Sequence, residues 1–259
     1  MSRRRSLSVF FWPTVALGLY LLVAAYPPLW ESLLGRLFPS ESRLVYLQSS
    51  MLKLIAQTVL MVAVASTLST AIGMSLGIFV TRPSGADFYD VVSDLANFGQ
   101  TFPPIAVLTL SVPLLGFGFE PTIFALTLYG ILPVLQNTIG GIEAVEPSMV
   151  ETARAMGLTS RQVLYHAELP VAAPVIFAGV RVSVIVGVAT ATIGATIGAG
   201  GLGAPIISGL ANSDPAVTLQ GGLLAAGLAL ILDAFLGATE KVLGRTTASR
   251  AAVERTARA

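Results

Sequence analysis

Residues 143–170 read EAVEPSMVETARAMGLTSRQVLYHAELP and separate two long apolar stretches. Pro147 suits the first position of a helix, where its missing N–H leaves no hydrogen bond unmade. Gly157 suits the left-handed position that ends a helix. Thr159 and Gln162 then have the spacing of a capping box, which opens a second helix. The segment therefore predicts two short helices joined at Gly157.

Two further features of the same segment concern its ends and its partner. Pro170 is expected to stop the second helix and to start the next apolar stretch. On the first helix, Met149, Ala153 and Met156 share one face. Soft methionine side chains suit a groove in another protein, but they could equally pack against the helix ends of this chain. Composition leaves both interpretations open.

The composition indicates a membrane protein. The chain has 259 residues, of which 54% are hydrophobic and 11% are charged, whereas soluble domains carry about 25% charged residues. The net charge of +1 gives no electrostatic case for nucleic acid as a partner. The absence of cysteine excludes disulfides and thiolate sites. Because the chain has a single histidine, His166, a metal centre built from histidines is not expected.

Six stretches are long and apolar enough to cross a bilayer as helices, which needs about 20 residues each. They lie at roughly 8–26, 52–80, 93–116, 121–142, 171–197 and 217–239. Their continuous apolar character favours helices over a β-barrel, so an all-α polytopic membrane helical bundle is expected. The first stretch could be a signal peptide, but its apolar run is long for one, which favours an uncleaved span.

The positions of Lys and Arg predict the orientation of the chain. With a cytoplasmic N-terminus, only Arg36, Arg43 and Lys53 fall outside. The residues that fall inside are Arg3, Arg4, Arg5, Arg82, Arg154, Arg161, Lys241, Arg245, Arg250, Arg255 and Arg258. Both termini and the 143–170 segment are therefore expected on the cytoplasmic side of the membrane, which the resemblance described next implies to be a prokaryotic cell (inner) membrane.

The 143–170 segment resembles a family pattern, Glu-Ala-Ala-x3-Gly-x9-Ile-x-Leu-Pro, of the permeases of binding-protein-dependent ABC importers (the MetI-like family). The matching residues are Glu151, Ala153, Gly157, Leu169 and Pro170. Thr152 stands where the second Ala is usual and Ala167 where Ile is usual; both changes keep a small residue in a helix. The resemblance implies a type I ABC importer permease fold.

The resemblance also implies a division of the chain and a set of contact residues. It implies a permease core over 52–240, preceded by a first span and outer loop in 1–51 and followed by a basic cytoplasmic tail, 241–259. Residues 147–166 would be coupling helices that sit in a cleft of an ATPase subunit. The residues implied in that contact are Met149, Glu151, Ala153, Met156, Gly157, Arg161, His166, Leu169 and Pro170.

Other stretches resemble a narrower group within the family. The sequences QTFPP (100–104), PLLGFG (113–118), LYGILP (128–133) and IGAGGLG (197–203) are similar to permeases for osmoprotectants such as glycine betaine, carnitine and choline. Methionine and phosphonate permeases carry similar glycine-rich elements, so these cargoes remain alternatives.

The glycine-rich element at 198–203 cannot be a P-loop, because it has no lysine to reach nucleotide phosphates. Its place at the expected outer end of the fifth span favours a gate or path lining, with a plain loop as the alternative. The candidate residues are Gly198, Gly200, Gly201, Gly203 and Phe102. Phe102, with Phe117 and Phe119, could meet a quaternary amine through cation–π contacts, or could face lipid and neighbouring helices.

Two charges lie inside expected spans, Arg181 in the fifth and Asp233 in the sixth, at comparable depth. An unpaired charge there is costly, so we expect an ion pair between them; snorkelling of Arg181 is the alternative. Gly73 and Gly77, four residues apart, predict a close approach of two helices.

The sequence shows no substrate-binding domain and no P-loop, so separate partner proteins are expected to supply them. No outer segment is long enough for a fused binding domain, so a separate periplasmic or lipid-anchored binding protein is expected. Two separate ATPase subunits would bind ATP and Mg²⁺, so this chain is expected to be no enzyme and to hold no cofactor or metal. A second permease subunit, identical or homologous, would complete the path. An ion-coupled secondary transporter is the competing class, but no internal repeat supports it.

Overall fold

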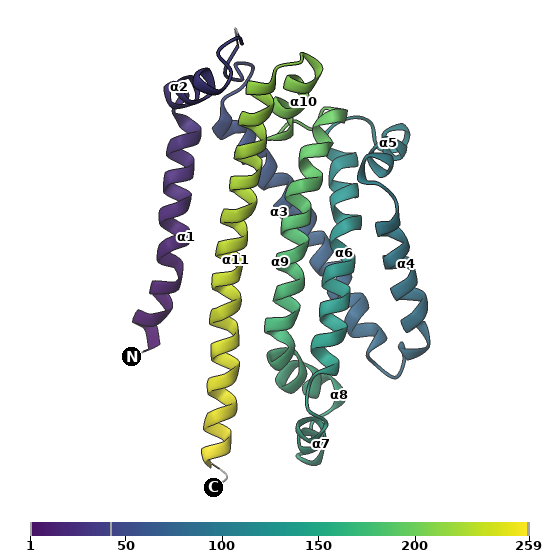
Figure 1. Ribbon diagram of the computed structural model, residues 1–259. Coiled ribbons are helices and arrows are strands. Elements are labelled where there is room, and N and C mark those ends of the chain that lie inside the picture. Colours follow the sequence, from purple (N-terminus) through teal and green to yellow (C-terminus); the bar gives the residue numbers. More distant parts are fainter. Residues whose placement is uncertain (1, 42, 258–259) are drawn as a thin grey trace.

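The computed structural model describes residues 2–41 and 43–257, and the side chains of residues 9–41 and 43–244. The described backbone is helical with connecting turns, so the predicted all-α fold is confirmed (Figure 1). The elements are α1 Ser2–Ala25, α2 Pro27–Leu37, α3 Met51–Val80, η1 Ala86–Phe88, α4 Tyr89–Thr101, α5 Pro104–Leu115, α6 Phe119–Glu143, α7 Pro147–Ala155, α8 Ser160–Val163, η2 Leu164–Glu168, α9 Leu169–Gly194, η3 Ala195–Ile197, α10 Gly203–Ala211 and α11 Pro215–Ala257.

Among the described residues, four helices are long and apolar enough to cross a membrane alone, namely 51–80, 119–143, 160–197 and 215–244. Two bent helix pairs raise the number to six if each pair is one span. In Figure 1 the chain runs back and forth along these helices, and its two ends lie at the same end of the bundle as α7 and α8. Of the basic residues used for the orientation, Arg258 and the side chains of Arg3, Arg4, Arg5, Arg245, Arg250 and Arg255 lie outside the described part.

The prediction of one continuous span over 93–116 is wrong. The structure has two helices there, α4 and α5, which meet at an angle of 96°. The break falls at Phe102 (ψ 138°) and Pro103 (ψ 138°), both in extended conformation. Each of these residues precedes a proline, and the proline ring excludes the helical conformation from the residue before it. The QTFPP sequence therefore breaks the span.

The first expected span ends with a similar bend, and the helix beyond it was not predicted. α1 and α2 meet at 76°, where Tyr26 precedes the Pro27-Pro28 pair. Trp30 Nε1 donates a hydrogen bond across the bend to the carbonyl oxygen of Val23 at 2.9 Å. α1 itself lies at the edge of the bundle, where the Tyr20 hydroxyl donates to the carbonyl oxygen of Leu224 on α11 at 2.8 Å.

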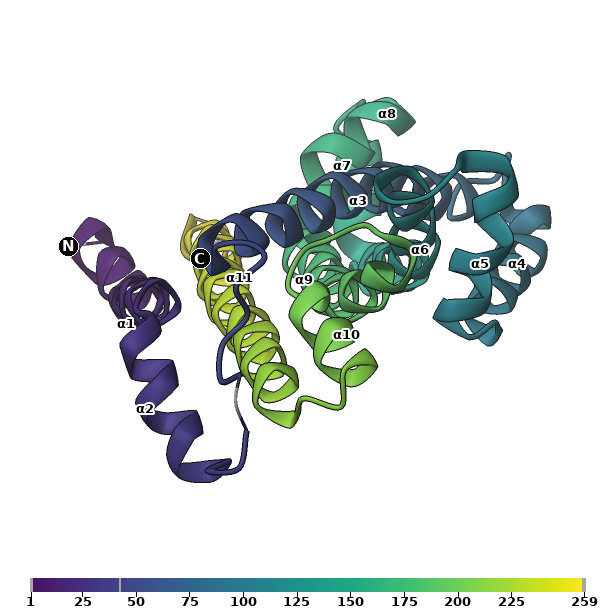
Figure 2. The ribbon, with the colours of Figure 1, turned by 90° about the horizontal axis from the view of Figure 1, so that it is seen from above.

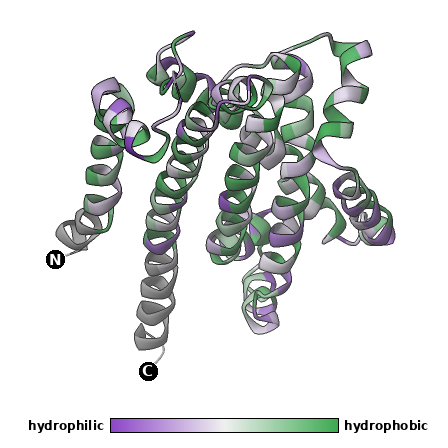
Figure 3. Cartoon of the chain, turned by 45° about the horizontal axis from the view of Figure 1, so that its top comes forward, coloured by the Kyte–Doolittle hydropathy of each residue, from purple (hydrophilic) through white to green (hydrophobic). Residues whose placement is uncertain are grey.

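The centre of the bundle is the crossing of α3, α6 and α9, and in Figure 2 α3 runs across α6 and α9. The predicted close approach at Gly73 and Gly77 is confirmed. A Cβ added at Gly73 would lie 2.9 Å from the carbonyl oxygen of Ile131, and one at Gly77 would lie 2.7 Å from Thr138 Cβ. Hydrophobic residues cover most of the long helices in Figure 3, as lipid on the outside and close packing on the inside require.

Candidate coupling and pathway sites

The 143–170 segment has the local structure that its sequence predicts. Pro147 occupies the first turn of α7, which ends at Ala155. Gly157 follows with a φ of +86°, the left-handed conformation that glycine adopts without strain. The Thr159 hydroxyl and the Gln162 side chain then cap each other's backbone in a complete capping box. Two helices joined at Gly157 are therefore confirmed.

The predicted helix stop at Pro170 is wrong. α8, the π-helical turn η2 and α9 follow without interruption, so one helix runs from Ser160 to Ile197. An ordinary α turn would press the proline ring against the carbonyl four residues earlier. In the wider π turn the Leu169 N–H donates to the carbonyl oxygen of Leu164, and the helix passes through the proline. The second short helix is thus the base of α9.

The residues implied in ATPase contact divide into three groups by exposure. Those at the surface are Glu151, Met156, Gly157, Arg161 and His166; those half-buried are Met149, Leu169 and Pro170; Ala153 is buried. The methionine face is therefore split, since Met156 is 69% exposed while Ala153 is 5% exposed and packs within the chain. The surface that a partner could reach lies around Gly157, at the tip between α7 and α8.

One ion pair in this region was missed by the sequence analysis. Arg82, just after α3, lies with Nη1 2.7 Å from Glu168 Oε2 in the π turn. Glu168 is 6% exposed and lies four residues from both Leu164 and Ala172, which are also buried. Helical spacing from two apolar residues places a carboxylate on the buried face, so this pattern could have revealed the buried Glu168 but not its partner.

The predicted pair between Arg181 and Asp233 forms, and a second carboxylate joins it. Arg181 Nε lies 2.7 Å from Asp233 Oδ1, and Arg181 Nη1 lies 2.9 Å from Glu240 Oε2. Gly237 leaves room for the guanidinium, since a Cβ there would lie 3.0 Å from Arg181 Cζ. Residues 233, 237 and 240 share one face of α11 by helical spacing, so that spacing could have revealed Glu240. The cluster joins α9 to α11.

The glycine-rich element is a fixed turn against the start of α3. Gly198, Gly200 and Gly201 have φ values of +83°, +77° and +66°. The Gly201 N–H donates to Gln57 Oε1 at 3.1 Å, and the Leu202 N–H donates to Thr58 Oγ1 at 2.9 Å. Gly198 is exposed and Gly200 half-buried, whereas Gly201 and Gly203 are buried. Gly198 and Gly200 are thus the two of these four candidates that are open to the surface of this chain, and a role of any of the four in a path stays a prediction.

Replacing Gly201 by valine is expected to destabilise this turn. Valine avoids positive φ, and its Cβ would lie 2.6 Å from Thr58 Oγ1. We expect the thermal midpoint of the purified protein to fall by about 5 °C or more. Gly222→Ala in α11 is the matched control, because a Cβ there meets no atom within 4 Å. Equal midpoints for the two variants would contradict a fixed turn.

Phe102 lies at the break between α4 and α5, beside α6. The Tyr129 hydroxyl donates to its carbonyl oxygen, and Gln100 Nε2 donates to the carbonyl oxygen of Tyr129 at 2.8 Å. The Phe102 side chain is 40% exposed and lines an apolar cavity of about 350 Å³ with Phe124 and residues of α5. The connection between α5 and α6 reaches the glycine-rich element, because a Cβ at Gly118 would lie 3.6 Å from the Gly198 carbonyl oxygen.

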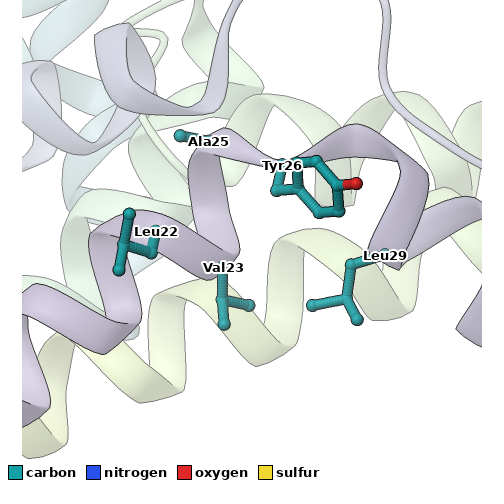
Figure 4. A pocket seen from close by; sticks show the side chains of 5 residues that line it. All are labelled: Leu22, Val23, Ala25, Tyr26 and Leu29. Carbon is teal, nitrogen blue, oxygen red and sulfur yellow. The ribbon is translucent and has the colours of Figure 1, made fainter.

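A second apolar cavity, of about 330 Å³, lies at the elbow between α1 and α2 (Figure 4). Its lining residues are Leu22, Val23, Ala25, Tyr26 and Leu29. Leu22 and Leu29 are 70% and 41% exposed, so the hollow is continuous with the outer surface of α1. None of the residues expected to couple or to line a path contributes to it.

Comparison with known sequences identifies the family. Residues 73–243 match the family described as binding-protein-dependent transport system inner membrane component. The carnitine transport permease protein OpuCB of Listeria monocytogenes is 38% identical over 177 residues, which cover 68% of this chain and 80% of that protein. The choline transport system permease protein OpuBB of Bacillus subtilis is 37% identical over 181 residues, with coverages of 70% and 82%. The osmoprotectant import permease protein OsmY of Salmonella typhimurium is 38% identical over 165 residues, with coverages of 64% and 70%.

Solved structures share the fold at lower identity. A chain of the MetNI methionine ABC transporter in an inward-facing conformation superposes with a TM-score of 0.67 at 22% identity, over 74% of this chain and 95% of that chain. A chain of an amino acid ABC transporter superposes with a TM-score of 0.60 at 18% identity, over 76% and 93%. The type I importer permease fold is thus shown, and the protein belongs to the family of binding-protein-dependent transport system inner membrane components.

Proposed function

We propose that this chain is the permease subunit of an ATP-driven importer of osmoprotectants such as glycine betaine, carnitine or choline. Family membership carries the transport role. The cargo is supported by relatives named for carnitine, choline and osmoprotectant transport, at 37–38% identity. Two of these relatives are named for the quaternary amines carnitine and choline and the third for osmoprotectants, which favours this class over methionine or phosphonate, although the fold is shared with a methionine transporter.

The 143–170 segment is the proposed docking site for an ATPase. It projects from one end of the bundle in Figure 1, and its tip exposes Met156, Arg161 and His166 to a partner. Two ATPase subunits would bind ATP and Mg²⁺ and hydrolyse the nucleotide outside this chain. A second permease subunit would face this one, and a separate binding protein would deliver the cargo at the opposite end.

The end of the bundle with α7 and α8 is proposed to be cytoplasmic. Of the described side chains, Arg82, Arg154, Arg161 and Lys241 belong to elements at that end, and Arg36, Arg43 and Lys53 to elements at the other. The backbone of α1 and α11 brings both chain ends to the α7 side. The excess of basic residues near cytoplasmic ends then favours this orientation.

The path for the cargo is proposed to pass the outer break region. The Phe102 ring is partly exposed at the break, and the exposed Gly198 and half-buried Gly200 belong to the turn that the connection after α5 approaches. Irregular backbone at membrane depth is tolerated where it lines a cavity or is buried in protein. Both the extended Phe102-Pro103 break and the glycine-rich turn meet that description.

Uptake of labelled glycine betaine tests the cargo. The permease is expressed with its ATPase and binding protein in cells that lack betaine transporters of their own. We expect uptake that excess carnitine or choline inhibits and that excess methionine leaves unchanged. Inhibition by methionine alone would reject the osmoprotectant class, and uptake without the ATPase would favour an ion-coupled secondary transporter instead.

A further inference from the structure

Arg82 is held rigidly at the end of α3. Its N–H donates to the carbonyl oxygen of Phe79 at 3.1 Å, and its own carbonyl accepts the Gly85 N–H at 2.9 Å. A Cβ at Gly85 would lie 2.8 Å from the carbonyl carbon of Phe79, so the chain folds tightly back on the helix end. The ring of Phe88 packs 5.9 Å from that of Phe79. The Arg82 guanidinium is therefore expected to move together with α3.

Glu168 is equally fixed, but in the helix that continues from the 143–170 segment. It lies in the π turn between α8 and α9, with its side chain 8% exposed, and its Oε2 atom is 2.7 Å from Arg82 Nη1. Just above the pair, Leu169 and Ala172 pack with Met74 and Ile78 of α3. An ionic and an apolar contact thus join the base of α9 to the end of α3.

The pair is partly buried, with the Arg82 side chain 22% exposed and the Glu168 side chain 8% exposed. Among the described residues, Arg82 Nε has no hydrogen-bond partner, and Glu168 Oε2 accepts no hydrogen bond of good angle despite its short distance to Nη1. A buried ion pair with incomplete hydrogen bonds contributes little net stability. The stability that the ion pair contributes therefore does not by itself explain why a charged residue occupies position 168.

The helix that receives this contact reaches the other end of the molecule. α3 runs from Met51 to Val80, and near its start Gln57 and Thr58 accept the hydrogen bonds of Gly201 and Leu202. α3 therefore links the ion pair at one end of the bundle to the glycine-rich turn at the other. These contacts form a continuous physical connection between two distant sites.

We propose that Arg82 and Glu168 form a strut that transmits movement of the 143–170 segment to α3, and through it to the glycine-rich turn. The strut sets how much transport each ATP hydrolysis drives. This rests on the proposed function, since it requires an ATPase docked on the 143–170 segment. Both residues act by positioning α3 and neither contacts ATP or cargo.

The test measures ATP hydrolysed per molecule of glycine betaine imported, using the complete complex with its binding protein in proteoliposomes. We expect Arg82→Gln and Glu168→Gln to keep the ATPase bound and hydrolysing. Uptake should fall by about fivefold or more, the lower end of the usual range for coupling between sites. The charge-reversed double variant, R82E with E168R, should bring the ratio back toward the wild-type value. Asp87→Asn, an exposed charge on the same connection, is the control and should leave the ratio unchanged.

Three results would contradict the proposed strut. The single variants could hydrolyse as much ATP per imported glycine betaine as the wild type, or the folded double variant could hydrolyse as much per imported molecule as the single variants. The third contradicting result is a Thr58→Val variant with the wild-type ratio of ATP hydrolysed to glycine betaine imported. The last variant removes the hydroxyl that accepts from Leu202 and donates to the Leu54 carbonyl oxygen at the far end of α3, so it tests the link from α3 to the glycine-rich turn even where the charge variants fail to fold. Failure of the proposed function is seen separately, as wild-type complex whose uptake does not need ATP.

Discussion

Replacing Gly157 by leucine is expected to reduce ATP-driven uptake strongly while the chain stays folded in the membrane. A Cβ at Gly157 meets no atom within 4 Å, so a side chain there projects away from the fold. It would occupy the space that the ATPase needs at the tip between α7 and α8. We expect transport and ATPase co-purification to fall by about tenfold or more, which corresponds to losing about 1.4 kcal/mol of docking free energy.

The leucine variant also strains the backbone, because Gly157 has a φ of +86°. Gly157→Asn separates the two effects, since asparagine adopts the left-handed conformation at helix ends with little strain and has a short side chain. We expect this variant to keep most of the transport activity. Wild-type transport by Gly157→Leu would contradict docking at this tip.

Replacing Arg181 by methionine is expected to destabilise the packing of α9 on α11. Asp233 and Glu240 would then face each other without their shared cation. A charged side chain at the centre of a membrane helix costs about 3 kcal/mol on insertion scales, and less where it is partly solvated. The three side chains are 32–34% exposed, so we expect a loss of about 1–2 kcal/mol and a lower thermal midpoint.

The rescue of this variant identifies the cause. Adding Asp233→Asn and Glu240→Gln to Arg181→Met removes both unpaired carboxylates, and we expect most of the lost stability to return. Lys241→Met is the control, because Lys241 is exposed and neighbours the cluster. If Arg181→Met has the same midpoint as this control, the cluster does not stabilise the packing of α9 on α11.

The features that sequence reasoning predicted are those decided by neighbouring residues. Pro147, Gly157 and the Thr159–Gln162 capping box each satisfy a local backbone requirement, and the structure has them as expected. The Arg181–Asp233 pair was also foreseeable, because burial of a lone charge demands a partner at similar depth.

The features that sequence reasoning missed depend on competing local preferences of the backbone, or on contacts between residues that are distant in sequence. The effect of proline was predicted wrongly at two places. The Phe102-Pro103 sequence interrupts a span that was predicted to be continuous, and the helix predicted to stop at Pro170 continues through a π turn. Whether a helix ends at a proline or continues through it in a π turn depends on the surrounding packing. The Arg82–Glu168 contact joins residues far apart in sequence, and no short pattern reveals which helix ends meet.

ATP dependence of uptake in proteoliposomes is the most direct measurement of the central claim, that this chain is a path driven by a separate ATPase. The permease, ATPase and binding protein are reconstituted with ATP on the ATPase side and labelled glycine betaine on the other. We expect accumulation only when ATP, Mg²⁺ and the binding protein are all present, and none when an ion gradient replaces ATP. Accumulation driven by an ion gradient, with the ATPase left out, would contradict the account.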